Sequence, residues 1–108
     1  MNKSIAVIRL AGELEIGRKD EISKALVIAG GESAVLLDFS DVIYADSTSL
    51  AELLRFRDDA SKQQIPVAIV IGSKQFARLI QYAGLSAAFR IFDSRAEALV
   101  DLSQATHE

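Results

Sequence analysis

The chain has 108 residues and a formal net charge of −3 at pH 7, and half of its residues are apolar while a quarter are charged. This length fits one domain, and this composition excludes a disordered chain. The sequence contains no cysteine, which excludes disulfides, thiolate nucleophiles and zinc sites that depend on thiolates. Lysine and arginine form no basic stripe, so we expect no nucleic-acid partner, because phosphate contacts need clustered positive charge.

Membrane and export signals are not evident in the sequence. No apolar run approaches the roughly 20 residues of a membrane span. Residues 1–15 lack the charged start, long apolar run and small-residue cleavage site of a signal peptide. We therefore expect a cytoplasmic protein with no direct membrane insertion.

The first third of the chain predicts two strands and a helix. Residues 5–10 form an apolar run with β-branched side chains that ends before Gly12, and residues 13–16 alternate charged with apolar side chains. A helix is expected over residues 18–28, ended by a glycine pair. Its apolar residues at helical spacing are Ile22, Ala25, Leu26 and Ala29.

The middle third predicts a strand, a loop and a long helix. Residues 34–37 are continuously apolar and end in Asp38, which is typical of a strand covered on both faces. We expect a loop over residues 39–45 and a helix over residues 47–63. The inner face of this helix is expected to hold Leu50, Leu53, Leu54 and Ala60. Its outer face is expected to hold Glu52, Arg55, Asp59 and Lys62.

The last third predicts two further strand–helix units. A strand over residues 67–71 follows the only proline, at the position where a missing N–H costs a strand least. A turn and a helix follow over residues 72–82. A short strand over residues 89–92 precedes a final helix, in which Ser94 and Glu97 form a capping-box pattern. The apolar residues that accompany the helix over residues 72–82 are Phe76, Leu79, Ile80 and Ala83. The final helix is expected to turn Ala98, Leu99 and Leu102 inward.

Strands that alternate with helices imply βαβ units and a mostly parallel or mixed sheet. No linker or repeat divides the chain. We expect a single α/β domain over residues 1–102 and a flexible C-terminal tail over residues 103–108.

Residues 44–50 gather hydroxyl groups and one carboxylate immediately before an apolar-periodic helix. Unpaired N–H groups and the positive dipole end favour oxygen-rich side chains or an anion at such a helix start. Asp, Ser and Thr are common helix caps, so the segment can be purely structural. A serine here can also carry a phosphate, which adds nearly two negative charges. The two interpretations are compatible, because different residues can serve each role.

Other polar groups indicate no chemistry of their own. Asp38, Asp41 and Asp46 lack the spacing of a cation site, so we expect solvated loop carboxylates. Residues 72–74 form a strand-to-helix turn without the P-loop frame, and the only histidine, His107, lies in the predicted tail. We expect no metal, no cofactor and no enzymatic activity. The basic residues expected on solvated helix faces are Arg55, Arg57, Lys62, Lys74 and Arg78.

Three parts of the chain resemble the STAS domain, the domain of sulfate-transporter tails and bacterial anti-sigma factor antagonists. Residues 12–15, G-E-L-E, are similar to the family's G-E-L-D turn. Residues 36–42 and 46–50 match a strand ending in D-L/F-S and the D-S-S/T-G-L phosphorylation loop. Residues 83–85 and 89–99 resemble its A-G-L…F-x-I-F-D-S…E-A-L ending. The likeness covers nearly the whole chain in the family's order.

The resemblance implies an α/β fold with a four- to five-stranded mixed sheet flanked by about four helices. It also implies an anti-sigma factor antagonist. The unphosphorylated protein would sequester an anti-sigma factor, a serine kinase of the ATP-binding histidine-kinase-like class, and so free a sigma factor. Phosphorylation would weaken that complex, and a PP2C-type phosphatase would reset the cycle.

By position, the resemblance implies Ser47 as the phosphoacceptor, with Thr48 and Ser49 as backups. It implies that the partner-binding residues are Glu15, Asp46, Ser47, Thr48 and Ser49. Two positions depart from the family pattern: Ser49 stands where glycine is usual, and Glu15 stands where the family has Asp.

Two other functions stay open at this point. STAS domains also resemble the non-phosphorylated cytosolic subunits of bacterial lipid-trafficking ABC transporters. A receiver domain with Asp38 as phosphoacceptor fits the length and the acid at the strand end. It lacks the paired acids after the first strand and the lysine at the end of the last strand.

Overall fold

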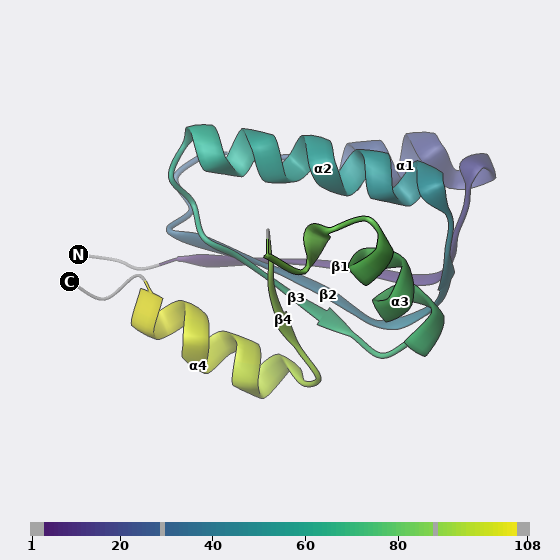
Figure 1. Ribbon diagram of the computed structural model, residues 1–108. Coiled ribbons are helices and arrows are strands. Elements are labelled where there is room, and N and C mark those ends of the chain that lie inside the picture. The colour runs from purple at the N-terminus through teal and green to yellow at the C-terminus, as the bar shows by residue number, and fades with distance from the viewer. Residues whose placement is uncertain (1–3, 29, 88, 106–108) are drawn as a thin grey trace.

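The computed structural model describes residues 4–28, 30–87 and 89–105. Within these residues four strands form one sheet in the order β1-β2-β3-β4 (Figure 1). The strands are β1 (Ile5–Leu14), β2 (Ala34–Ala45), β3 (Val67–Ile71) and β4 (Arg90–Phe92). All three strand pairs are parallel. The predicted α/β fold is confirmed, and the described part of the sheet is parallel rather than mixed.

Helices cover both faces of this sheet. The helical elements are η1 (Ile16–Arg18), α1 (Lys19–Ala25), α2 (Ser47–Lys62), α3 (Lys74–Tyr82), η2 (Leu85–Ala87) and α4 (Arg95–Ala105). Helices α1, α2 and α3 lie on one face, and α4 lies alone on the other (Figure 1). No helix in the described ranges has the length and apolar character needed to cross a membrane.

The sheet separates a large core from a small one. In the large core, on the α1–α3 side, the rings of Phe39 and Phe76 stack with centroids 5.9 Å apart. All five residues of β3 are buried, as expected for a central strand of a parallel sheet. The small core between the sheet and α4 contains Ala34, Leu36, Ala68, Val70, Ala98 and Leu102.

The first two strands are longer than predicted. The predicted strand over residues 13–16 is wrong, because β1 continues through Gly12, whose φ of +81° suits glycine. The predicted loop over residues 39–45 is also wrong, because this segment continues β2. Two register shifts between β1 and β2 each give β2 one extra residue. At each of these bulges one residue of β2 is left unpaired and the strand bends.

The buried face of α2 differs from the predicted one. Leu54, predicted to face inward, is 37% exposed, whereas Phe56 is fully buried. Glu52, expected on the outer face, is buried and accepts a hydrogen bond from Arg55 Nε at 3.1 Å. Arg55 also donates to the Leu26 carbonyl at 2.9 Å, so it joins α2 to the end of α1 rather than lying free in solvent. The buried residues of α2 are Ser49, Glu52, Leu53, Phe56 and Ala60.

The remaining boundaries lie close to the predicted ones. Helix α1 ends at Ala25, with Leu26 buried after it, and Ala29 lies outside the described residues. The Ser94 hydroxyl accepts a hydrogen bond from Glu97 N at 3.2 Å, which confirms the predicted cap. Helix α4 continues through residues 103–105, and residues 106–108, with the only histidine, lie outside the described part. The domain limit at residue 102 stays a prediction. Ala83, which the sequence groups with the apolar residues of α3, is exposed.

Candidate functional site

The start of α2 is organised by one carboxylate. Asp46 has an extended backbone, and its Oδ1 accepts hydrogen bonds from Thr48 N at 3.0 Å and Ser49 N at 3.3 Å. Its Oδ2 accepts a third bond from Ile16 N at 3.0 Å. Asp46 therefore caps the helix and ties it to the segment that follows β1.

A backbone bond completes this junction. Asp46 N donates to the Leu14 carbonyl at 3.0 Å, so Asp46 bonds to the residues on both sides of Glu15. The Glu15 side chain itself is exposed and caps no helix. Figure 1 shows the end of β1 and the start of α2 at the same end of the molecule. The structure thus brings together Glu15 and Asp46, two of the residues that the resemblance implies for partner binding.

The three hydroxyl groups after Asp46 differ in exposure. Ser47 is the first residue of α2 and is exposed, and Thr48 is half-buried. Ser49 is only 1% exposed, and its Oγ donates to the Asp46 carbonyl at 2.6 Å. The side chain at the position where glycine is usual therefore points inward and is already bonded. Among the three, Ser47 is the residue most open to solvent.

Two side chains from α3 and its cap, which the sequence did not indicate as site residues, bind the end of β2 as a clamp. Gln75 Oε1 accepts from Ala45 N at 3.0 Å, and Gln75 Nε2 donates to the Ala45 carbonyl at 2.8 Å. Ser73 Oγ donates to the Ile43 carbonyl at 3.3 Å and accepts from Phe76 N at 3.2 Å. Together these side chains of α3 and its cap hold the end of β2 directly before Asp46.

Close packing explains the turn before that clamp. A Cβ at Gly72 would lie 2.4 Å from the Ser40 carbonyl oxygen, so only glycine lets the chain pass so near β2. The strand-to-helix turn predicted for residues 72–74 is confirmed, with Ser73 as the cap of α3. The glycine gave a sequence signal for this turn, whereas Gln75 gave none, because a helical glutamine usually faces water.

Arg18 forms a second clamp that the sequence did not indicate. Its Nη1 donates to the carbonyls of Ala11 at 2.7 Å and Glu13 at 2.8 Å, across the irregular end of β1. Its Nε and Nη2 bind the Glu21 carboxylate at 2.9 and 2.7 Å. This hydrogen bonding raises the pKa of Arg18 and lowers the pKa of Glu21. The bonds of Arg18 to the two carbonyls hold the segment that leads to Glu15.

The three candidate loop acids have separate roles. Asp41 forms an ion pair with Arg9, and Asp46 caps α2. Asp38 is 5% exposed and accepts from Ser40 Oγ at 2.6 Å and from Arg95 Nε at 3.0 Å. The prediction of a solvated carboxylate was wrong for Asp38. Within the described residues no cluster of acidic or histidine side chains could hold a metal ion.

Competing effects act on the ionisation of Asp38. Burial favours the protonated form, but hydrogen bonds from Ser40 and the charge and hydrogen bond of Arg95 outweigh it. The net result is that the pKa of Asp38 lies below its ordinary value. Arg95 is the first residue of α4, so this ion pair between a buried carboxylate and a half-exposed guanidinium joins β2 to that helix.

One of the interpretations left open by the sequence is excluded by a match to a known family. The family model of the STAS domain matches residues 1–98. The chain belongs to the STAS domain family. The resemblance stated from sequence motifs is confirmed, and the receiver-domain hypothesis is wrong.

Solved structures show the same fold as this STAS domain. An anti-sigma factor antagonist from Mycobacterium paratuberculosis is 21% identical, with a TM-score of 0.85 over 95% of this chain and 89% of the other. A sulfate transporter family protein from Wolinella succinogenes is 20% identical, with a TM-score of 0.76 over 93% of this chain and 85% of the other. The unphosphorylated anti-sigma factor antagonist SpoIIAA is 18% identical, with a TM-score of 0.67 over 96% and 93%. A search of the curated proteins gives no match.

Proposed function

We propose that this STAS domain is a cytoplasmic anti-sigma factor antagonist switched by phosphorylation at Ser47. It acts as a binding module without catalytic activity of its own. The observation that carries the proposal is the contrast at the start of α2. Ser47 is exposed, while the hydroxyl of Ser49 is buried and bonded to Asp46. Thr48, which is half-buried, is the backup acceptor.

The unphosphorylated surface is the form that binds its partner in this proposal. Glu15, Asp46 and Ser47 with its neighbours contact an anti-sigma factor that is also a serine kinase of the ATP-binding histidine-kinase-like class. The sigma factor bound to that kinase is then released. The hydrogen bonds of Asp46 to the backbone of Ile16, Thr48 and Ser49 hold this surface in one shape before the partner arrives.

A phosphate on Ser47 would change the charge of this surface more than its shape. It adds close to two negative charges beside Asp46 and the exposed Glu15. The N–H groups of Thr48 and Ser49 are already bonded to Asp46, so they are not free to neutralise the phosphate. The phosphate therefore faces the partner, where burying unpaired charge is costly. A PP2C-type phosphatase restores the binding form.

The test compares Ser47→Asp and Ser47→Ala as bait in a pull-down from the native host. We expect the unmodified protein and Ser47→Ala to capture a small ATP-binding kinase, and Ser47→Asp to bind it about tenfold or more weakly. The matched control is Ser61→Asp, which places the same charge at the exposed far end of α2. Phosphopeptide mapping of the protein from host cells should place the phosphate on Ser47. Equal binding by Ser47→Asp would refute the switch.

A second candidate is a non-phosphorylated cytosolic subunit of a lipid-trafficking ABC transporter. The buried Ser49 favours it, because its hydroxyl and the Asp46 carboxylate complete the cap of α2 without a phosphate. In this case the unmodified protein and Ser47→Asp should capture a transporter ATPase equally. The protein isolated from cells should then carry no phosphate.

A further inference from the structure

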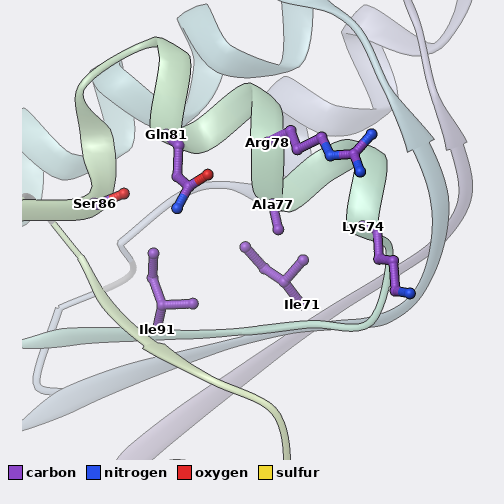
Figure 2. Close-up of a pocket in the computed structure, with 7 residues that line it drawn as sticks. All are labelled: Ile71, Lys74, Ala77, Arg78, Gln81, Ser86 and Ile91. Atoms are coloured by element: carbon purple, nitrogen blue, oxygen red, sulfur yellow. The ribbon is translucent and has the colours of Figure 1, made fainter.

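A hollow opens beside α3 at the edge of the sheet. Ile91 in β4 pairs in register with Ile69, so its side chain projects toward the face that α1–α3 cover. Helix α3 packs mainly over β2, and β4 has only three residues. Ile91 is therefore 39% exposed. Together with Ile71 and Ala77 it forms the apolar floor of a hollow of about 290 Å³ (Figure 2).

The polar groups around this floor are arranged at two ends. Figure 2 shows Lys74 and Arg78 extending toward one end, and Gln81 and Ser86 at the other. The chain has seven arginines, and Arg78 is the one that forms no ion pair within the described residues. Lys74 likewise has no carboxylate partner in that part of the chain. The two cations at this end are thus available to an external anion.

The size of the hollow limits what can fill it. A water molecule occupies about 30 Å³ in the liquid, so 290 Å³ corresponds to about ten waters or a ligand of about ten non-hydrogen atoms. An apolar floor with a few convergent polar groups is the usual composition of a small-molecule site. The unpaired cations at one end select a negative head group, and the floor selects an aliphatic tail.

We infer that the hollow between α3 and β4 binds a small amphipathic carboxylate with an aliphatic chain of about eight carbons. The carboxylate lies between Lys74 and Arg78, and the chain covers Ala77, Ile71 and Ile91. Gln81 and Ser86 limit the apolar floor at the far end. This site goes beyond the proposed antagonist function and uses none of the residues at the start of α2.

The experiment is a titration of the full chain with octanoate, followed by the amide resonances in proton–nitrogen correlation spectra. We expect saturable shifts at Ala77, Gln81 and Ile91, with a dissociation constant of about 10 μM to 1 mM for a ligand of this size. Octan-1-ol, which has the same chain without the charge, should bind about tenfold more weakly. From hexanoate to octanoate each methylene should strengthen binding about fourfold, and longer chains should add little.

A double variant tests the two cations directly. Lys74→Gln with Arg78→Gln should weaken octanoate binding about tenfold or more. Its melting temperature should be unchanged, because neither side chain forms an ion pair within the described residues. Lys24→Gln, which removes an exposed charge from α1, is the matched control and should bind within twofold of the unmodified protein.

Three results would overturn the inference. The first is the absence of saturable shifts with millimolar octanoate. The second is equal affinity for octan-1-ol and octanoate, which needs no variant and so does not depend on how the double variant folds. The third is a set of shifts centred on another part of the chain.

Discussion

Asp38 and Asp46 lie on the same stretch of chain, one inside β2 and one directly after it, yet they have opposite roles. Asp38 pairs in register with Val70 on the α4 face, where it is buried and bound by the side chains of Ser40 and Arg95. Asp46 is half-buried, and its carboxylate binds only backbone N–H groups around the start of α2. The same residue type therefore joins the sheet to α4 at one position and fixes the backbone of an exposed surface at the other, depending on which groups face it.

The largest effect is expected from Asp38→Ala. It removes a buried carboxylate with its ion pair, and leaves Arg95 unpaired but half exposed. We expect a loss of about 2–3 kcal/mol in the free energy of unfolding, measured by urea denaturation, with partner binding unchanged at 25 °C. The control is Asp101→Ala, which breaks the more exposed pair with Arg90 and should cost less than about 1 kcal/mol. A cost equal to the control's would show that the Asp38 pair contributes no more than a surface pair.

The pH dependence of stability is a second test of the contribution of Asp38 to the fold. The pKa of Asp38 is lowered in the folded state, so its stabilisation is complete above the unfolded pKa of about 3.9. This stabilisation is lost as the pH falls below about 4 toward the folded pKa. Urea denaturation between pH 7 and pH 2 should therefore show that the difference in the free energy of unfolding between the unmodified protein and Asp38→Asn becomes smaller on acidification. A difference that becomes larger in acid would mean that folding raises the pKa of Asp38 instead.

Asp46→Ala should have a smaller effect on stability and a larger one on binding. It removes the cap of α2 and the bond to Ile16 N, for which we expect a loss of about 1–2 kcal/mol in the free energy of unfolding. Binding of the anti-sigma factor should fall with the loss of the fixed surface, as measured by calorimetry. Asp46→Asn keeps one acceptor oxygen for the helix. Its stability and its binding should therefore lie between those of the unmodified protein and those of Asp46→Ala. If Asp46→Ala binds normally, the cap has a structural role alone.

Gln75→Ala should have the smallest effect of the series. It removes the two hydrogen bonds to Ala45 and should cost about 1 kcal/mol in the free energy of unfolding. Because the end of β2 is then less restrained, amide hydrogen exchange of residues 45–49 should accelerate more than that of β3. The matched control is Gln81→Ala, which removes an exposed glutamine from the same helix and should leave exchange at residues 45–49 unchanged. Equal acceleration by both variants would mean that the bonds to Ala45 do not restrain this segment.

Local signals in the sequence were sufficient for the element boundaries that depend on local bonds. Ser94 and Glu97 formed the expected cap, and α2 starts at Ser47 as predicted. Helix α2 also shows where local signals fail. Its apolar residues fall on more than one side, so periodicity could not decide between Leu54 and Phe56 for the core. The packing of α2 against both the sheet and α1 made that choice.

The candidate site was predictable only in part for the same reason. The motif identified Asp46 and Ser47, because the cap of a helix is formed by residues that are adjacent in the sequence. Gln75 bonds to Ala45, which is distant from it in the sequence. Arg18 bonds to backbone carbonyls, which every residue type has. Neither contact produces a sequence pattern. The ion pair between Asp38 and Arg95 likewise joins two residues that only the sheet topology brings together.

The parallel pairing of β1 with β2 has a consequence for how the chain acquires its binding surface during synthesis. Partners such as Ile5 and Ala34, or Leu14 and Ala45, are about 30 residues apart, so no local hairpin can nucleate them. The clamp from Gln75 belongs to a still later part of the chain. A nascent polypeptide therefore completes the start of α2 only after its third strand–helix unit has emerged, and truncated products lack the finished surface.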